Sequence, residues 1–175
     1  MLGWSFGGIM AHAFATRLRA AGEPVDLLTI VDAYPAPPNP TPLDPRHAVA
    51  ALLISLGITT DALELDAGQA LDLATAQGHP VAALGRDRLA AMAITFAANV
   101  ALQERYAVTR FTGDALLIES DLRHRLDSEA PGSWSPFITG SVDVVRINVP
   151  HGALLNPDPA ATIAAAVTNR LTPLG

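Results

Sequence analysis

A serine flanked by glycines stands close to the start of the chain, in the run Gly3-Trp-Ser-Phe-Gly7. The run fits Gly-x-Ser-x-Gly, the pattern of a sharp turn between a strand and a helix that lifts a serine hydroxyl clear of a sheet. Glycines are needed there because the turn brings strand and helix so close that a Cβ would collide. A hydroxyl presented in this way suits attack on a carbonyl carbon. The pattern therefore predicts Ser5 as a nucleophile. The following helix is expected to start at Ser5 and to direct its positive end at the chemistry.

Such a nucleophile needs two partners. A serine hydroxyl reacts slowly until an imidazole takes its proton, and the imidazole needs a carboxylate to fix its tautomer and favour its charged form. Asp32 and His151 each follow an apolar run that predicts a strand, and the chain order Ser, Asp, His is that of the α/β-hydrolase triad. The backbone N–H of Phe6 is expected to be one oxyanion donor. The second donor is expected from a loop after an earlier strand, which this chain does not contain.

Alternatives exist for both partners. Asp121 follows the next predicted strand, the more usual place for the acid in α/β-hydrolases, and competes with Asp32. Asp32 is favoured because its strand should lie beside the strand that leads to Ser5 and because a rigid proline-rich exit follows it. The remaining histidines are predicted to be surface or packing residues: His12, His47, His79 and His124.

The elements that must position these residues alternate between strand and helix. Ile9 to Ala20 has the spacing of a helix, and the near-continuous apolar run from Pro24 to Asp32 is typical of a fully buried parallel strand. Asp114 to Ser120 and Val142 to Val149 are the next predicted strands. In open α/β sheets the ligand crevice lies outside the carboxyl ends of the strands, so Ser5, Asp32 and His151 should emerge at one edge.

This pattern predicts an α/β fold of the α/β-hydrolase type, of which residues 1–175 form the C-terminal portion. Only Met1 and Leu2 precede the turn at Ser5, whereas such a turn needs a complete buried strand with parallel neighbours on both sides. We therefore expect the N-terminal strands of the domain to be missing, which would leave an unpaired sheet edge.

A helical block interrupts the strands. Six prolines in residues 33–45 form a stiff connection, after which residues 43–108 are predicted to be a helical lid inserted over the crevice, with an ordinary long connection as the alternative. Its first helix should cover Ala48 to Leu56, its second should be capped by Thr60 or Asp61, and its third should follow Asp87 and run to Arg105.

The last part of the chain is expected to be a loop, a strand and a helix. Residues 122–136 are predicted to be a loop, with Trp134 packed back onto the fold. The final helix is expected to start in residues 156–159 with Asp158 as the N-cap and a proline at the first helical position. Ile163 and Val167 should face the core.

The composition of the chain excludes several classes of function. A net charge of −6 with no basic stripe argues against nucleic-acid binding, and the lack of cysteine excludes thiolate catalysis and Cys-based metal sites. The longest apolar run, Leu89 to Ala98, is too short to span a bilayer and predicts a buried helix. No secretory signal is evident, so a cytoplasmic protein is the default expectation. No metal or cofactor is predicted.

Three segments carry a family resemblance: Leu2-Gly-Trp-Ser-Phe-Gly-Gly8, Leu18-Arg-Ala-Ala-Gly-Glu23 and Leu27-Leu-Thr-Ile-Val-Asp-Ala-Tyr-Pro35. With Trp134-Ser-Pro-Phe-Ile-Thr-Gly140 leading to His151, they resemble the thioesterase domain that ends nonribosomal peptide synthetases, most closely the siderophore-synthetase type. The resemblance covers essentially the whole chain. In that family the acid follows the strand after the serine turn, which implies Asp32 as the acid beside Ser5 and His151.

The resemblance implies a reaction and a partner. A finished peptidyl chain would pass from the phosphopantetheine arm of a carrier domain, encoded upstream in the same polypeptide, onto Ser5 as an ester. It would then leave by hydrolysis or by macrocyclisation. A stand-alone type II editing thioesterase and a catalytically inactive, truncated remnant are the alternatives.

Overall fold

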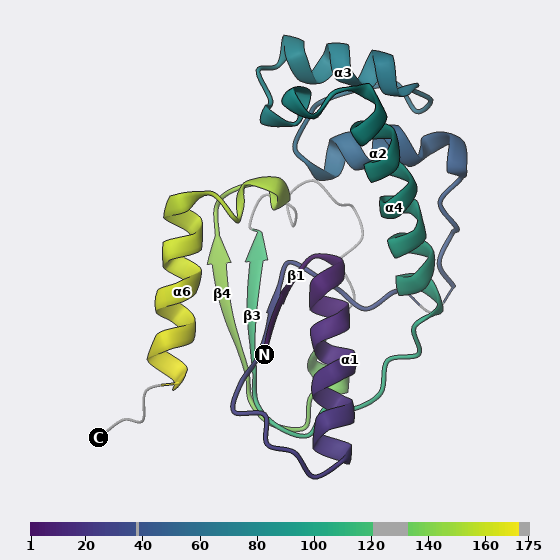
Figure 1. Ribbon diagram of the computed structural model, residues 1–175. Coiled ribbons are helices and arrows are strands. Elements are labelled where there is room, and N and C mark those ends of the chain that lie inside the picture. The colour runs from purple at the N-terminus through teal and green to yellow at the C-terminus, as the bar shows by residue number, and fades with distance from the viewer. Residues whose placement is uncertain (38, 121–132, 172–175) are drawn as a thin grey trace. The chain divides into compact units, whose positions relative to one another are not determined.

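The computed structural model describes residues 1–37, 39–120 and 133–171. The chain forms two compact units, one made of Met1–Pro38 and Tyr106–Gly175 and the other of Asn39–Arg105 (Figure 1). Among the described residues, all the strands belong to the first unit, whereas the second is helical. The first unit therefore carries the α/β part of the predicted fold.

The first unit is built on a four-stranded parallel sheet in the order β1-β2-β3-β4. The strands are β1 (Leu2–Trp4), β2 (Leu28–Val31), β3 (Ala115–Ser120) and β4 (Val142–Ile147). The parallel arrangement confirms the predicted fold class. The last three strands are shorter than predicted, because pairing defines them. β2 begins at Leu28, which pairs with Ala115 of β3, and it pairs with both neighbours only from Thr29 onward. β3 begins one residue later than predicted, and β4 ends where Ile147 lies opposite Ser120 at the end of β3.

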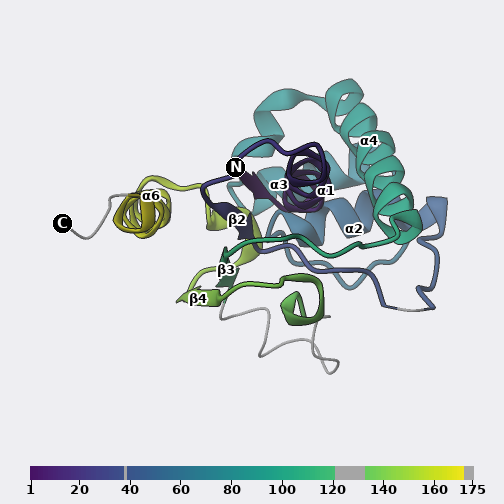
Figure 2. The ribbon, with the colours of Figure 1, turned by 90° about the horizontal axis from the view of Figure 1, so that it is seen from below.

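Two helices cover opposite faces of this sheet, α1 (Phe6–Ala20) and α6 (Pro157–Leu171), as Figure 2 shows from below. Side chains alternate between the faces along each strand, as the period of a strand requires. On β2, Leu28 and Ile30 pack under α1, whereas Val31 packs on the α6 side with Ile163. The sheet therefore has a hydrophobic core on each face.

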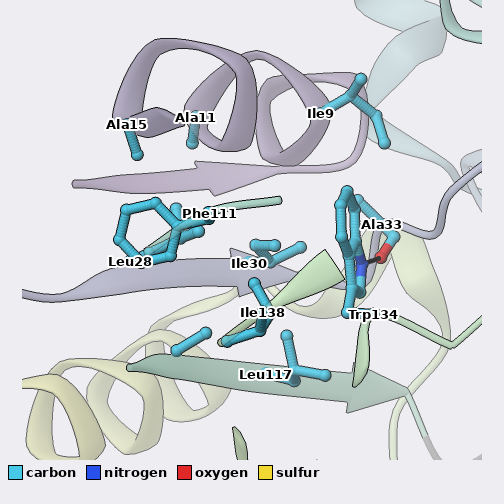
Figure 3. Close-up of a cluster of buried hydrophobic side chains, with 11 residues drawn as sticks. Ile9, Ala11, Ala15, Leu28, Ile30, Ala33, Phe111, Leu117, Trp134 and Ile138 are labelled. Atoms are coloured by element: carbon cyan, nitrogen blue, oxygen red, sulfur yellow. Dashed lines mark hydrogen bonds between the residues drawn. The ribbon is translucent and has the colours of Figure 1, made fainter. Parts of the chain in front are cut away.

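The core on the α1 side includes residues from well separated segments (Figure 3). Ile9, Ala11 and Ala15 of α1 meet the sheet, and Trp134 packs there with only 1% of its surface exposed. The Trp134 indole N–H donates to the carbonyl of Ala33, with the two atoms 2.7 Å apart. Trp134 thus packs back onto the fold as predicted, and it anchors the chain directly after Asp32.

In the first unit, helices α1 and α6 begin at other residues than predicted. Ser5 is the N-cap of α1, so the helix begins one residue later, at Phe6. The final helix α6 begins at Pro157, and Asp158 lies in its first turn instead of capping it. Proline at the first helical position needs no N–H partner, so the helix can start one residue before Asp158. An aspartate in the first turn still favours the helix through the macrodipole.

The second unit contains three α-helices, α2 (Ala48–Ser55), α3 (Ala67–Ala76) and α4 (Arg86–Arg105), with short 3₁₀ segments η1 (Pro45–His47) and η2 (Pro80–Leu84). Its own core gathers Leu53, Ile58, Ala70, Ala74, Val81 and Leu89. The unit covers most of the predicted 43–108 block. Its role as a lid stays a prediction.

The cap predicted at Thr60 or Asp61 is wrong, because α3 begins later. Asp66 caps it: one carboxylate oxygen accepts from the N–H groups of Gly68 and Gln69, and the Gln69 side chain accepts from the Asp66 N–H in return. This reciprocal pair satisfies backbone donors that Thr60 or Asp61 would leave open. Thr60 instead accepts from the N–H of Ala62.

The apolar run Leu89 to Ala98 lies in α4, but only one face of that helix is buried. Leu89 and Ala93 are enclosed, whereas 73% of the Ile94 surface is exposed. In the described ranges, no helix has both the length and the apolar character that crossing a membrane requires.

The glycines around Ser5 allow a matched test of the turn. A Cβ built on Gly3 would lie 1.9 Å from the Gly7 carbonyl oxygen, whereas one on Gly7 meets nothing within 4 Å. The predicted collision is therefore confirmed at Gly3 and wrong at Gly7. We expect Gly3→Ala to destabilise the protein by about 3 kcal/mol or more, because backbone must move to admit the methyl group. Gly7→Ala should be neutral or slightly stabilising, since it lies inside a helix. Urea unfolding of both variants measures this, and equal stabilities would contradict the described geometry.

Candidate active site

Ser5 sits at the junction of β1 and α1 in a conformation that side chains rarely adopt, with φ 55° and ψ −131°. Its N–H donates to the Val31 carbonyl at 2.9 Å, and its carbonyl accepts from the N–H of Gly8 at 2.7 Å. Its side chain makes no capping bond to the helix. The backbone bonds hold a costly conformation in place, as is typical of functional sites.

Asp32 occupies the equivalent place at the end of β2. Its φ is 45°, and among the described residues only Ser5 shares a positive φ without being glycine. Its side chain is fully buried. One carboxylate oxygen, Oδ1, accepts from the Tyr34 hydroxyl at 3.0 Å and from the backbone N–H of Ser120 at 3.1 Å. Donors of this kind favour the ionised carboxylate and fix its orientation.

His151 contacts the other oxygen of the same carboxylate. It begins the 3₁₀ turn η4 (His151–Ala153) after β4, and its Nδ1 lies 2.6 Å from Oδ2 of Asp32. A contact this short between a carboxylate and a ring nitrogen assigns the proton to Nδ1. In the neutral imidazole Nε2 then carries the free lone pair, which is the arrangement a general base needs.

Ser120 connects the acid to the segment that carries the histidine. Besides donating its N–H to Asp32, it donates its hydroxyl to the Val149 carbonyl at 2.6 Å, two residues before His151. Ser120 is fully buried at the end of β3. β3 lies between β2 and β4 in the sheet. Ser120 therefore connects Asp32, which follows β2, to the segment after β4 that carries His151.

The structure places all four predicted site residues in the first unit, at the carboxyl ends of its strands. It joins His151 to Asp32, and the ring of Trp4, next to Ser5 in the chain, stacks on the His151 ring. Within the described chain, no hydrogen bond joins the Ser5 hydroxyl to His151. Phe6 is the first residue of α1, so its N–H is one of those that have no carbonyl partner inside the helix.

The structure describes some of the competing residues and not others. Asp121 and His124 fall outside the described residues, and His47 and His79 belong to the second unit. No group of three or more His, Asp or Glu side chains that could hold a metal ion occurs among residues 1–37, 39–120 and 133–171. Sequence reasoning did not identify Tyr34 and Ser120 as partners of the acid. Their only sequence signal is their position, two residues after Asp32 and at the end of the next predicted strand.

His12 was predicted to be a surface or packing residue, and the structure shows that it is a packing residue, although a polar one. It is fully buried on α1, with Nδ1 3.2 Å from the Tyr106 hydroxyl and its ring against Trp134. Burial lowers the pKa of His12 below its usual 6.5. The unfolded chain therefore binds more protons than the native state once the pH falls below 6.5, so acidification through this range costs stability.

We expect His12→Asn to remove that contribution, since the amide can bond Tyr106 without titrating. The difference in unfolding free energy between the parent and the variant should change with pH below 6.5, by at most about 1.4 kcal/mol per pH unit for one proton, and stay constant above it. Urea titrations from pH 5 to pH 8 measure this. A difference that is flat throughout would contradict the assignment.

Comparison with known proteins identifies the family. The family model described as "Thioesterase domain" matches residues 1–170. The chain belongs to the thioesterase domain family. A dimodular nonribosomal peptide synthase of Bacillus subtilis (strain 168) is 32% identical over 181 residues, which cover 99% of this chain and 8% of that protein. The chain thus spans less than a tenth of this relative.

Solved structures agree on the fold. The thioesterase domain of NocB, in covalent complex with a fluorophosphonate nocardicin G analogue, matches with a TM-score of 0.59 at 22% identity, covering 97% of this chain and 64% of that one. The surfactin thioesterase domain SrfTE matches with a TM-score of 0.61 at 17% identity, covering 98% and 66%. These likenesses confirm the predicted α/β-hydrolase type of fold. With the family match, they identify a hydrolase of the thioesterase class, and the siderophore type stays a prediction.

Proposed function

We propose that this thioesterase domain releases a peptidyl or acyl chain from the phosphopantetheine arm of a carrier domain, through an ester on Ser5. The single observation that carries the proposal is the 2.6 Å contact between His151 and the buried Asp32. Asp32 directly follows β2, and β2 pairs with β1, the strand that leads to Ser5. Family membership supports the thioester as substrate. The similarity to a nonribosomal peptide synthase supports a peptidyl carrier domain as partner. We propose that this carrier lies upstream in the same polypeptide.

Acylation follows from the roles of these groups. The Ser5 oxygen attacks the thioester carbonyl carbon while His151 Nε2 takes the hydroxyl proton, and Asp32 stabilises the resulting imidazolium. The N–H of Phe6 would donate to the oxyanion that forms on the carbonyl oxygen. The C–S bond then breaks, and the thiol of the carrier arm leaves with the proton from His151. The products are a Ser5 ester and a free carrier thiol.

Deacylation uses the same groups in reverse. Water, or an amine or hydroxyl of the bound chain, gives a proton to His151 and attacks the ester carbonyl. The Ser5 oxygen then leaves and recovers the proton. Water gives the free acid, and an internal nucleophile gives a macrocycle. Exclusion of water would favour cyclisation, which is the role we propose for the helical block 43–108 as a lid.

The proposal is tested with a carrier protein loaded with either a peptidyl or an acetyl group as a thioester. We expect the peptidyl carrier to be unloaded faster, with a matching mass increase on Ser5 in rapidly quenched samples and neither effect in Ser5→Ala. Faster unloading of the acetyl carrier would instead indicate an editing thioesterase. Failure of a folded sample to unload either carrier would indicate an inactive remnant and overturn the proposal.

A further inference from the structure

Trp4, the residue directly before Ser5, contacts the His151 ring, and the proposed reaction gives this contact no role. The Trp4 and His151 rings are stacked, with centroids 5.0 Å apart and planes inclined by 23°. Trp4 is the last residue of β1, where it lies opposite Val31 in the register. Its ring also packs on the α6 side of the sheet, against a core that includes Leu154 and Ile163. The indole is therefore held by both its backbone and its surroundings.

The stack complements the bond to Asp32. A single hydrogen bond at Nδ1 restrains the imidazole but still lets the ring tilt through its side-chain torsions, because such bonds tolerate some misalignment. An aromatic surface against the ring face removes that freedom, because the ring must stay nearly parallel to it. The direction of Nε2 is thus set by Trp4 and Asp32 together. Because Trp4 precedes Ser5 directly, one strand end carries both the nucleophile and the surface that orients its base.

The role of the aromatic face of Trp4 can be distinguished from that of its indole N–H. Trp4 Nε1 is buried and has no hydrogen-bond partner in the described part of the chain. An unpaired buried donor is costly, so a hydrogen bond does not account for an indole at this position. Phenylalanine would keep an aromatic face without this donor, and leucine would keep apolar bulk without an aromatic face.

We propose that Trp4 is a positioning residue that holds the His151 imidazole in its working orientation by stacking. The inference rests on the proposed function, because only there does His151 act as the base for Ser5. The orientation of the ring itself can be measured without turnover.

The experiment compares Trp4→Leu with Trp4→Phe in two measurements. In thioester hydrolysis we expect Trp4→Leu to lower kcat about 10-fold or more with KM unchanged, because misplacing a catalytic group slows the chemical step. Trp4→Phe should stay within about 3-fold of the parent, since an aromatic face remains. Thermal unfolding of both variants shows that they are folded.

Proton NMR of His151 supplies the readout that does not depend on activity. We expect a downfield Nδ1–H signal in the parent and in Trp4→Phe, and its loss or broadening in Trp4→Leu as the ring becomes mobile. A sharp signal in folded Trp4→Leu, or an unchanged kcat in that variant, would overturn the proposal. If the parent shows no turnover but the NMR pattern holds, the proposed function fails while the positioning role stands.

Discussion

Replacing His151 with glutamine is expected to lower kcat/KM for a thioester by about 10⁵- to 10⁶-fold, the scale seen when the base of a serine hydrolase is removed. Glutamine can still bond Asp32, but its amide cannot accept the Ser5 proton or return it to the leaving thiol. KM should change little, because His151 is not required to hold the substrate. Steady-state release of free thiol measures the effect.

The control is His47→Gln, a change at a histidine of the second unit whose ring nitrogen lies 4.0 Å from Glu64. We expect that variant to retain the parent rate, and both variants to unfold at temperatures close to the parent. A His151→Gln protein that retains more than about a hundredth of the parent rate would show that another group acts as the base.

Replacing Asp32 with asparagine is expected to lower kcat by about 10⁴-fold at constant pH. The asparagine oxygen can still accept from Tyr34 and from the Ser120 N–H, so the side chain keeps its place. Its amide then donates to Nδ1 of His151 and moves the imidazole proton to Nε2. A base protonated at Nε2 cannot take the Ser5 proton, so the loss arises from the wrong tautomer and not from a collapsed site.

Asp143→Asn is the matched control, because Asp143 is a half-exposed carboxylate that contacts Arg170 on α6 at 3.0 Å. We expect no measurable change in rate from it, since surface ion pairs contribute little. An Asp32→Asn protein with nearly full activity, with its fold confirmed by circular dichroism, would mean that the contact between Asp32 and His151 has no role in the chemistry.

Sequence reasoning was most successful where one local rule was sufficient. The carboxyl ends of parallel strands lie at one sheet edge, and Asp32 and His151 each follow a predicted strand. Their positions in the sequence were therefore enough to predict that the two residues lie close together. It was less successful at element ends. The start of β2 depends on which residues find partners on β1 and β3, and the N-cap of α3 depends on the reciprocal bond between Asp66 and Gln69.

The partners of the acid could not be predicted for a related reason. Ser120 reaches Asp32 across 88 positions of the chain and is positioned by the register between β2 and β3, which a single sequence does not specify. Tyr34 is close in sequence, but its contact with the carboxylate depends on the path of the backbone at Asp32, whose positive φ the sequence does not specify. The stacking of Trp4 on His151 likewise depends on the path of the chain after β4.

Trapping with a fluorophosphonate, followed by peptide mapping, tests most directly whether the strand ends assemble an activated serine. The serine oxygen would displace fluoride from phosphorus and leave a stable adduct. We predict a single adduct, on Ser5, formed at least about 100-fold more slowly in His151→Gln and absent in Ser5→Ala. A folded sample that is not labelled, or an adduct on another residue, would contradict the account.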